Sequence, residues 1–149
     1  MLRWLLAVTH LLALGIGLGA IWTRARALRQ PLDGTGLRRA FAADTWWGLA
    51  GLLWIVTGLW RLFAGTEQPT AYYLRNHVFW AKMTLLGLLL ALEIGAVITM
   101  TGWRRDVARS RMPDTAQAGR LARVSAVQAG LVILMLLAAT AMARGYGSR

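Results

Sequence analysis

Four polar side chains that stand inside long apolar runs are the residues of this sequence that could do chemistry: His10, Lys82, Glu93 and Gln128. An imidazole can bind a metal or carry a proton. An amine or a carboxylate in an apolar run can bind an opposite charge or take part in proton transfer. A charged residue near the centre of a bilayer costs at least about 2.5 kcal/mol, so such residues usually face a partner, a cavity or a cofactor.

Lys82 and Glu93 lie on nearly the same face of one helix, because eleven residues at about 100° per residue complete about three turns. They are roughly 16 Å apart along that helix, too far for a direct pair, so each needs a partner elsewhere. The opposite face carries Gly87, Ala91 and Gly95, a small-residue pattern that lets another helix approach closely. We therefore expect contacts on both sides of this helix.

The elements that position these residues are expected to be transmembrane helices. The chain has 149 residues, of which 57% are hydrophobic, and a mean hydropathy of +0.49, which is high for a soluble domain. A helix needs about 20 apolar residues to cross a bilayer. The sequence therefore predicts one all-α domain over residues 1–149, a four-helix transmembrane bundle. The predicted spans are residues 2–22, 45–63, 77–101 and 121–143.

Two helix boundaries need a choice. Residues 2–22 resemble a cleaved signal peptide in part, but the run is longer than a typical signal core, and Arg24 and Arg26 follow at once as in a stop-transfer sequence. We favour a retained helix. The connection from 23 to 43 is expected to be irregular, and Asp44 is the predicted N-cap of the second span.

The net charge of +11 does not indicate nucleic-acid binding, because the arginines gather in two connections between apolar runs, as the positive-inside rule describes. We expect no nucleic-acid partner, those two connections in the cytoplasm, and both termini outside. The eleven arginines of these connections are Arg24, Arg26, Arg29, Arg38, Arg39, Arg104, Arg105, Arg109, Arg111, Arg120 and Arg123. The five on the other side are Arg3, Arg61, Arg75, Arg144 and Arg149.

This topology predicts two polar layers. His10 lies about 12 Å below the outer end of its span and Lys82 about 7 Å below the outer end of its own, with roughly 6 Å of side-chain reach to add. Glu93 and Gln128 lie about 12 Å and about 10 Å from the inner ends of their spans. We therefore expect His10 near Lys82 in an outer layer, and Glu93 near Gln128 in an inner layer.

Each of these residues has a plainer interpretation. His10 could be a hydrogen-bonded packing residue, and Lys82 could extend outward to the interface. Glu93 could be protonated and hydrogen-bonded to Gln128, or it could belong to a proton path. His77 stands at the membrane boundary, where solvation is expected.

The absent residues narrow the chemistry. With no cysteine, the chain has no disulfide, no thiolate metal site and no C-x-x-C-H haem attachment. Two histidines cannot build a zinc site with the usual ligands. A haem b with His10 as its metal ligand fits the sequence, with Lys82, a methionine such as Met83, or nothing opposite.

The segments DTWWG at 44–48, TGLWR at 57–61 and NHVFWAK at 76–82 resemble a family of small, uncharacterised bacterial integral membrane proteins. The resemblance implies a multi-pass protein of the bacterial inner membrane. More distantly, a first-helix His10 with a third-helix Lys82 is similar to HemJ-type protoporphyrinogen oxidase and to CopD-type membrane domains. That resemblance implies haem b, although His77 and Glu93 stand where the HemJ-type pattern differs.

Two functional hypotheses follow. The first is a haem- or porphyrin-binding redox protein, with His10 and Lys82 binding the cofactor and Lys82 and Glu93 as catalytic candidates. The second is a non-enzymatic membrane protein, a small transporter or an assembly subunit, in which Lys82 and Glu93 move protons or fix packing. In both cases the lipid bilayer is the first partner, and the small-residue faces allow either a homo-oligomer or a closed monomer.

Overall fold

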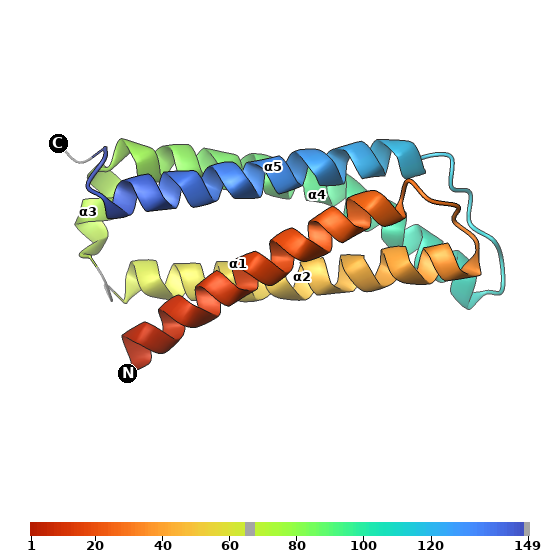
Figure 1. Cartoon of the computed structure of the whole chain (residues 1–149), viewed down its shortest axis with the longest axis horizontal. Helices are drawn as coiled ribbons and strands as arrows, with labels where there is room; N and C mark the ends of the chain where they lie inside the picture. Colours follow the sequence, from red (N-terminus) through yellow and green to blue (C-terminus); the bar gives the residue numbers. More distant parts are fainter. Residues whose placement is uncertain (65–67, 148–149) are drawn as a thin grey trace.

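The computed structural model describes residues 1–64 and 68–147, and within these ranges the only regular structure is helical. The helices are α1 (Leu2–Ala27), α2 (Gly34–Phe63), α3 (Thr70–Arg75), α4 (His77–Ala108) and α5 (Ala118–Ala143). The long helices lie side by side, and the short helix α3 lies at one end of the bundle (Figure 1).

The four long helices, α1, α2, α4 and α5, are each long and apolar enough to cross a membrane. Large apolar side chains cover their outer surfaces, for example Leu12, Leu52 and Ile98, which are exposed by 60%, 63% and 68%. Such a surface is stable in hydrocarbon rather than in water. The predicted all-α architecture with four apolar helices is therefore confirmed, and each helix extends beyond the apolar segment that was expected to span the membrane.

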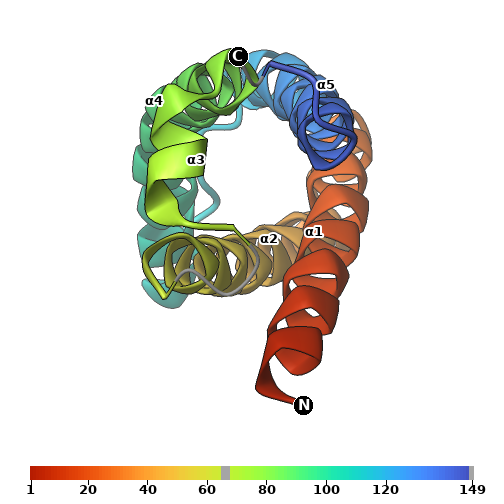
Figure 2. The same cartoon turned by 90° about the vertical axis from the view of Figure 1, so that its left-hand side faces the viewer.

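The helices form a ring when the bundle is viewed from the end where α3 lies (Figure 2). Helix α1 packs on α2 and on α5, α4 packs on α5, and α3 contacts both α2 and α4. The small-residue face of α4 is open, because no atom lies within 4 Å of a Cβ built on Gly87 or Gly95. The expectation that α4 is contacted on both faces is therefore wrong for the single chain.

The connection between α1 and α2 is much shorter than expected, because both helices continue through the arginine-containing segments to Ala27 and from Gly34. Asp44 lies inside α2, and the predicted N-cap role belongs to Asp33. The Asp33 carboxylate accepts hydrogen bonds from the backbone N–H groups of Thr35 at 2.9 Å and Gly36 at 2.8 Å. A short polar residue before a helix start satisfies N–H groups that have no partner within the helix.

Asp33 is expected to make the stability of the protein depend on pH. The two backbone hydrogen bonds hold the pKa of the Asp33 carboxyl below its ordinary value of 3.8 in the folded protein. The stabilisation is therefore present above the unfolded-state pKa and is lost as the pH falls through the lower folded-state pKa. Thermal unfolding between about pH 6 and about pH 2.5 should show this loss relative to Asp33→Asn, which caps without titrating. Parallel curves for the two proteins would contradict the assignment.

The C-terminal residues are bound to the start of α4. Asn76 caps α4, because its side-chain oxygen accepts from the N–H groups of Val78 at 2.8 Å and Phe79 at 3.2 Å. Its amide donates to the Tyr146 carbonyl at 3.1 Å, and the His77 N–H donates to the Gly147 carbonyl at 3.3 Å. The tail therefore lies beside α3 at one end of the bundle.

The interior contains two apolar clusters, one behind the other along the bundle. The cluster nearer the arginine-rich end, where residues 28–33 and 109–117 connect the helices, includes Leu37, Met100 and Leu121. The second cluster includes Ile21 and Val132 and extends toward the α3 end. Each long helix has a short segment between its contributions to the two clusters, and these four segments can form a polar layer.

Candidate functional site

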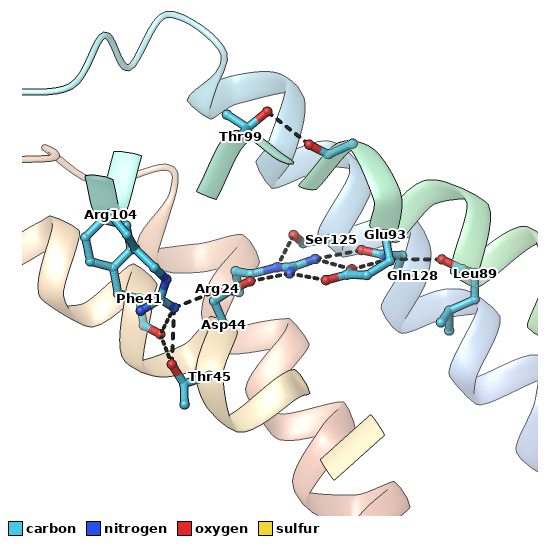
Figure 3. Close-up of polar contacts among 11 residues, drawn as sticks. Arg24, Phe41, Asp44, Thr45, Leu89, Glu93, Thr99, Arg104, Ser125 and Gln128 are labelled. Carbon is cyan, nitrogen blue, oxygen red and sulfur yellow. Dashed lines mark hydrogen bonds and ion pairs between the residues drawn. The ribbon is translucent and has the colours of Figure 1, made fainter. Parts of the chain in front are cut away.

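A single arginine occupies the gap between the two apolar clusters. Arg24 of α1 is only 1% exposed, and all three of its guanidinium nitrogens donate to other helices (Figure 3). Nη1 donates to Asp44 at 2.7 Å and to Glu93 Oε1 at 2.9 Å. Nη2 donates to Glu93 Oε2 and to Gln128 Oε1, both at 2.9 Å. Nε donates to the Ser125 hydroxyl at 3.0 Å.

Gln128 completes the contacts of the Glu93 carboxylate. Its side-chain amide donates to Glu93 Oε2 at 2.7 Å and to the backbone carbonyl of Leu89 at 3.3 Å. The prediction that Glu93 and Gln128 lie in one layer is therefore confirmed. The partner that neutralises Glu93 is Arg24, which the sequence analysis placed in a cytoplasmic connection.

Arg104 of α4 adds a second arginine at the edge of the cluster. Its guanidinium donates to Asp44 Oδ2 at 3.0 Å, to the Phe41 carbonyl at 2.8 Å and to the Thr45 hydroxyl at 3.1 Å. It also lies over the Phe41 ring, 4.7 Å from the ring centroid, a favourable cation–π position. Asp44 thus bridges the two arginines.

The Arg24 cluster, comprising Arg24, Asp44, Glu93, Arg104, Ser125 and Gln128, joins all four long helices. Two arginines and two carboxylates give it no net charge. Fully paired buried charges avoid the penalty of an isolated ion. This geometry is typical of a structural ion-pair network, because both carboxylates, those of Asp44 and Glu93, already accept hydrogen bonds from a guanidinium.

The layer that was predicted to be the outer one contains His10. His10 Nδ1 lies 2.9 Å from the Thr57 hydroxyl oxygen, and that hydroxyl donates to the Leu53 carbonyl at 2.7 Å. The Thr57 hydroxyl therefore joins the His10 ring to the backbone of α2 and holds the ring in place. The His10 ring also stacks on Trp54, with centroids 5.8 Å apart.

A cavity of about 400 Å³ lies at this level, and both His10 and Lys82 line it. The prediction that these two residues lie near each other in one layer is therefore confirmed. Arg61 and Tyr72 also line it, with the aromatic rings of Trp54, Tyr73 and Phe79. The indole N–H of Trp54 is buried and has no hydrogen-bond partner among the described residues. Lys82 likewise makes no hydrogen bond or ion pair within the part of the chain that the structure describes.

The other sequence candidates lie elsewhere. Met83 is not in the cavity wall, whereas Met135 is. His77 is exposed at the start of α4. Within residues 1–64 and 68–147 no group of three or more His, Cys, Asp or Glu side chains could hold a metal ion.

Gly58 lies directly beside the His10 ring, and its lack of a side chain leaves room for that ring. A Cβ built on Gly58 would lie 3.1 Å from His10 Cε1, whereas one built on Gly51 of the same helix would meet nothing within 4 Å. Both glycine-to-alanine changes improve helix propensity by about 1 kcal/mol. Thermal unfolding in detergent should therefore show Gly51→Ala as the more stable variant, because Gly58→Ala must displace the His10 ring. Equal gains in the two variants would contradict this account.

The fold and site together define a multi-helix membrane protein with a neutral polar cluster in its interior and a separate cavity that contains a histidine and a lysine. The chain belongs to the family described as "Predicted membrane protein (DUF2214)", whose model matches residues 2–147. Comparison with curated proteins and with solved structures found no match.

Proposed function

We propose that the cavity at the α3 end binds an apolar, carboxylate-bearing ring compound of the porphyrin class, with haem b as the first candidate. The observation that carries the proposal is the convergence on one cavity of His10, oriented by Thr57, and the Lys82 amine, which has no ion-pair partner among the described residues. A few polar groups that converge on a mostly apolar cavity commonly mark the place where a ligand binds.

The residues of the cavity fit such a group. His10 Nδ1 is hydrogen-bonded to the Thr57 hydroxyl, and a second hydrogen bond of this kind is usual for a metal-binding histidine because it fixes the ring. Lys82 and Arg61 supply positive charge for carboxylates. Met135 offers a thioether, and the aromatic walls suit a flat ring. The cavity volume of about 400 Å³ lies in the range of small-molecule sites.

In this proposal the chain supplies binding and orientation. His10 would bind the metal of such a group, Lys82 would neutralise a carboxylate, and the apolar walls would exclude water. A bound haem b would supply one-electron chemistry, and His10 with its hydrogen bond to Thr57 would hold the haem and tune its properties. We place the protein in the bacterial inner membrane with both termini outside, which rests on the arginine distribution and on the family resemblance.

The test is a titration of the detergent-purified protein with haem b and, separately, with metal-free protoporphyrin, followed by absorption spectroscopy. The proposal expects saturable binding of both, and a haem band that His10→Ala shifts or abolishes. His77→Ala is the matched control, because it removes the other histidine from an exposed position outside the cavity. No saturable binding of either compound, or equal effects of the two histidine variants on the haem band, would overturn the proposal.

A second function, that of a non-enzymatic assembly or packing protein, is favoured by one observation. Glu93 is bound through both oxygens by the Arg24 guanidinium, which suits a fixed structural carboxylate better than a proton carrier. Under this alternative, Glu93→Gln changes stability and leaves proton flux across vesicles unchanged. Loss of a proton flux in Glu93→Gln would instead favour transport.

A further inference from the structure

A second hollow lies on the outside of the bundle, between α1 and α2 at the arginine-rich end. It is an open groove of about 1100 Å³. In Figure 1, α1 crosses α2 and the two helices diverge toward the connection at residues 28–33. The groove shares none of its lining residues with the His10 cavity, so it needs an explanation of its own.

The groove is apolar at one end and positively charged at the other. Ile16 and Ala20 form its apolar part, and Arg26 and Arg39 lie at the end near the connection. From Ile16 to Arg26 the helix rises about 15 Å, which is about half the thickness of the hydrocarbon core of a bilayer. The groove therefore has the length of one lipid leaflet.

Two tryptophans flank the groove at the level expected for the membrane interface. Trp22 and Trp46 both line it and are exposed by 55% and 59%. Tryptophan favours the boundary between hydrocarbon and headgroups. Their position places the arginine end of the groove at the depth of lipid headgroups.

The two arginines at this end are available for a phosphate. Within the described residues neither Arg26 nor Arg39 has an ion-pair partner, in contrast to Arg24 and Arg104. Asp33 also lines the groove, but its carboxylate is turned to the N–H groups at the start of α2. Arg26, Arg39 and Asp33 together give this end of the groove a net charge of one positive unit.

We propose that this groove binds an anionic phospholipid, with the phosphate at Arg26 and Arg39 and an acyl chain along Ile16 and Ala20. Basic pockets between transmembrane helices are a known form of lipid-headgroup site. The charge and the apolar length of the groove select a lipid over a soluble anion, which would leave the apolar part exposed.

The experiment compares two double variants of equal charge in native mass spectrometry of protein released from nanodiscs of mixed phosphatidylglycerol and phosphatidylcholine. Arg26→Gln/Arg39→Gln removes the groove arginines. Arg29→Gln/Arg38→Gln removes two exposed arginines of the same region that do not line the groove. Wild type and the control should retain phosphatidylglycerol preferentially, and the groove variant should lose about 30-fold in this preference, since each arginine contributes about fivefold.

A second measurement keeps the proposal testable if the groove variant folds poorly. Brominated phosphatidylglycerol should quench the tryptophan fluorescence of wild type more than brominated phosphatidylcholine does, and Trp22→Phe/Trp46→Phe should remove that difference. Equal lipid loss in the two arginine double variants, or no headgroup preference in wild type, would overturn the proposal.

Discussion

Arg24→Gln should destabilise the protein more than any other single change to a polar side chain, by about 3–5 kcal/mol. The guanidinium is 1% exposed and binds side chains from α2, α4 and α5, so its loss leaves the Glu93 carboxylate, which is 17% exposed, without a counter-charge. Unfolding by heat or by increasing SDS in detergent micelles, followed by helical circular dichroism, would measure the loss.

The control for this prediction removes the orphaned charge as well. In Arg24→Gln/Glu93→Gln the remaining carboxylate, Asp44, keeps its ion pair with Arg104 at 3.0 Å, and Gln128 can still donate to the amide at position 93. We therefore expect the double variant to be more stable than Arg24→Gln alone. Additive losses from the two changes would mean that Arg24 and Glu93 are not coupled.

Lys82→Met should weaken the binding of a porphyrin with free carboxylates by about 10-fold to 100-fold, because it removes one charge-assisted hydrogen bond from the proposed site. Methionine retains much of the length of the side chain and packs well in an apolar wall. Fluorescence titration with metal-free protoporphyrin would measure the change without any contribution from His10 as a metal ligand.

The matching control changes the ligand instead of the protein. The dimethyl ester of the same porphyrin has no carboxylate for Lys82 to bind, so wild type and Lys82→Met should bind it equally well. If Lys82→Met weakens both ligands by the same factor, the lysine acts through the shape of the cavity and the proposed ion pair is wrong.

The positions of Glu93 and Gln128 were predictable because helix geometry converts sequence spacing into depth, and a buried carboxylate must find a partner at its own depth. Arg24 was missed for a specific reason. A basic residue directly after an apolar run is typical of a helix that stops at the membrane surface, whereas here α1 continues to Ala27 and turns Arg24 inward. The unpaired charge on Glu93 was the signal that could have found it.

The start of α2 shows a second limit of sequence analysis. Asp33 and Asp44 both precede helix-forming residues, and apolar content favoured Asp44 as the cap. The structure begins α2 at Gly34 because Pro31 turns the chain and Gly36 packs against the Pro31 carbonyl, where a Cβ would collide with that oxygen. Asp44 is thereby left inside the helix, facing the two arginines. Thr57 and Trp54 likewise became partners of His10 only through the crossing of α1 and α2.

The balance of charges in the Arg24 cluster has a consequence for an energised membrane. A transmembrane potential does work of about 2.3 kcal/mol per elementary charge per 100 mV on a charge that crosses it. Arg24, Arg104, Asp44 and Glu93 sum to zero and are bound to one another, so the potential exerts almost no net force on the cluster. The Arg24 cluster should therefore stabilise the packing of the four long helices equally well in energised and de-energised cells.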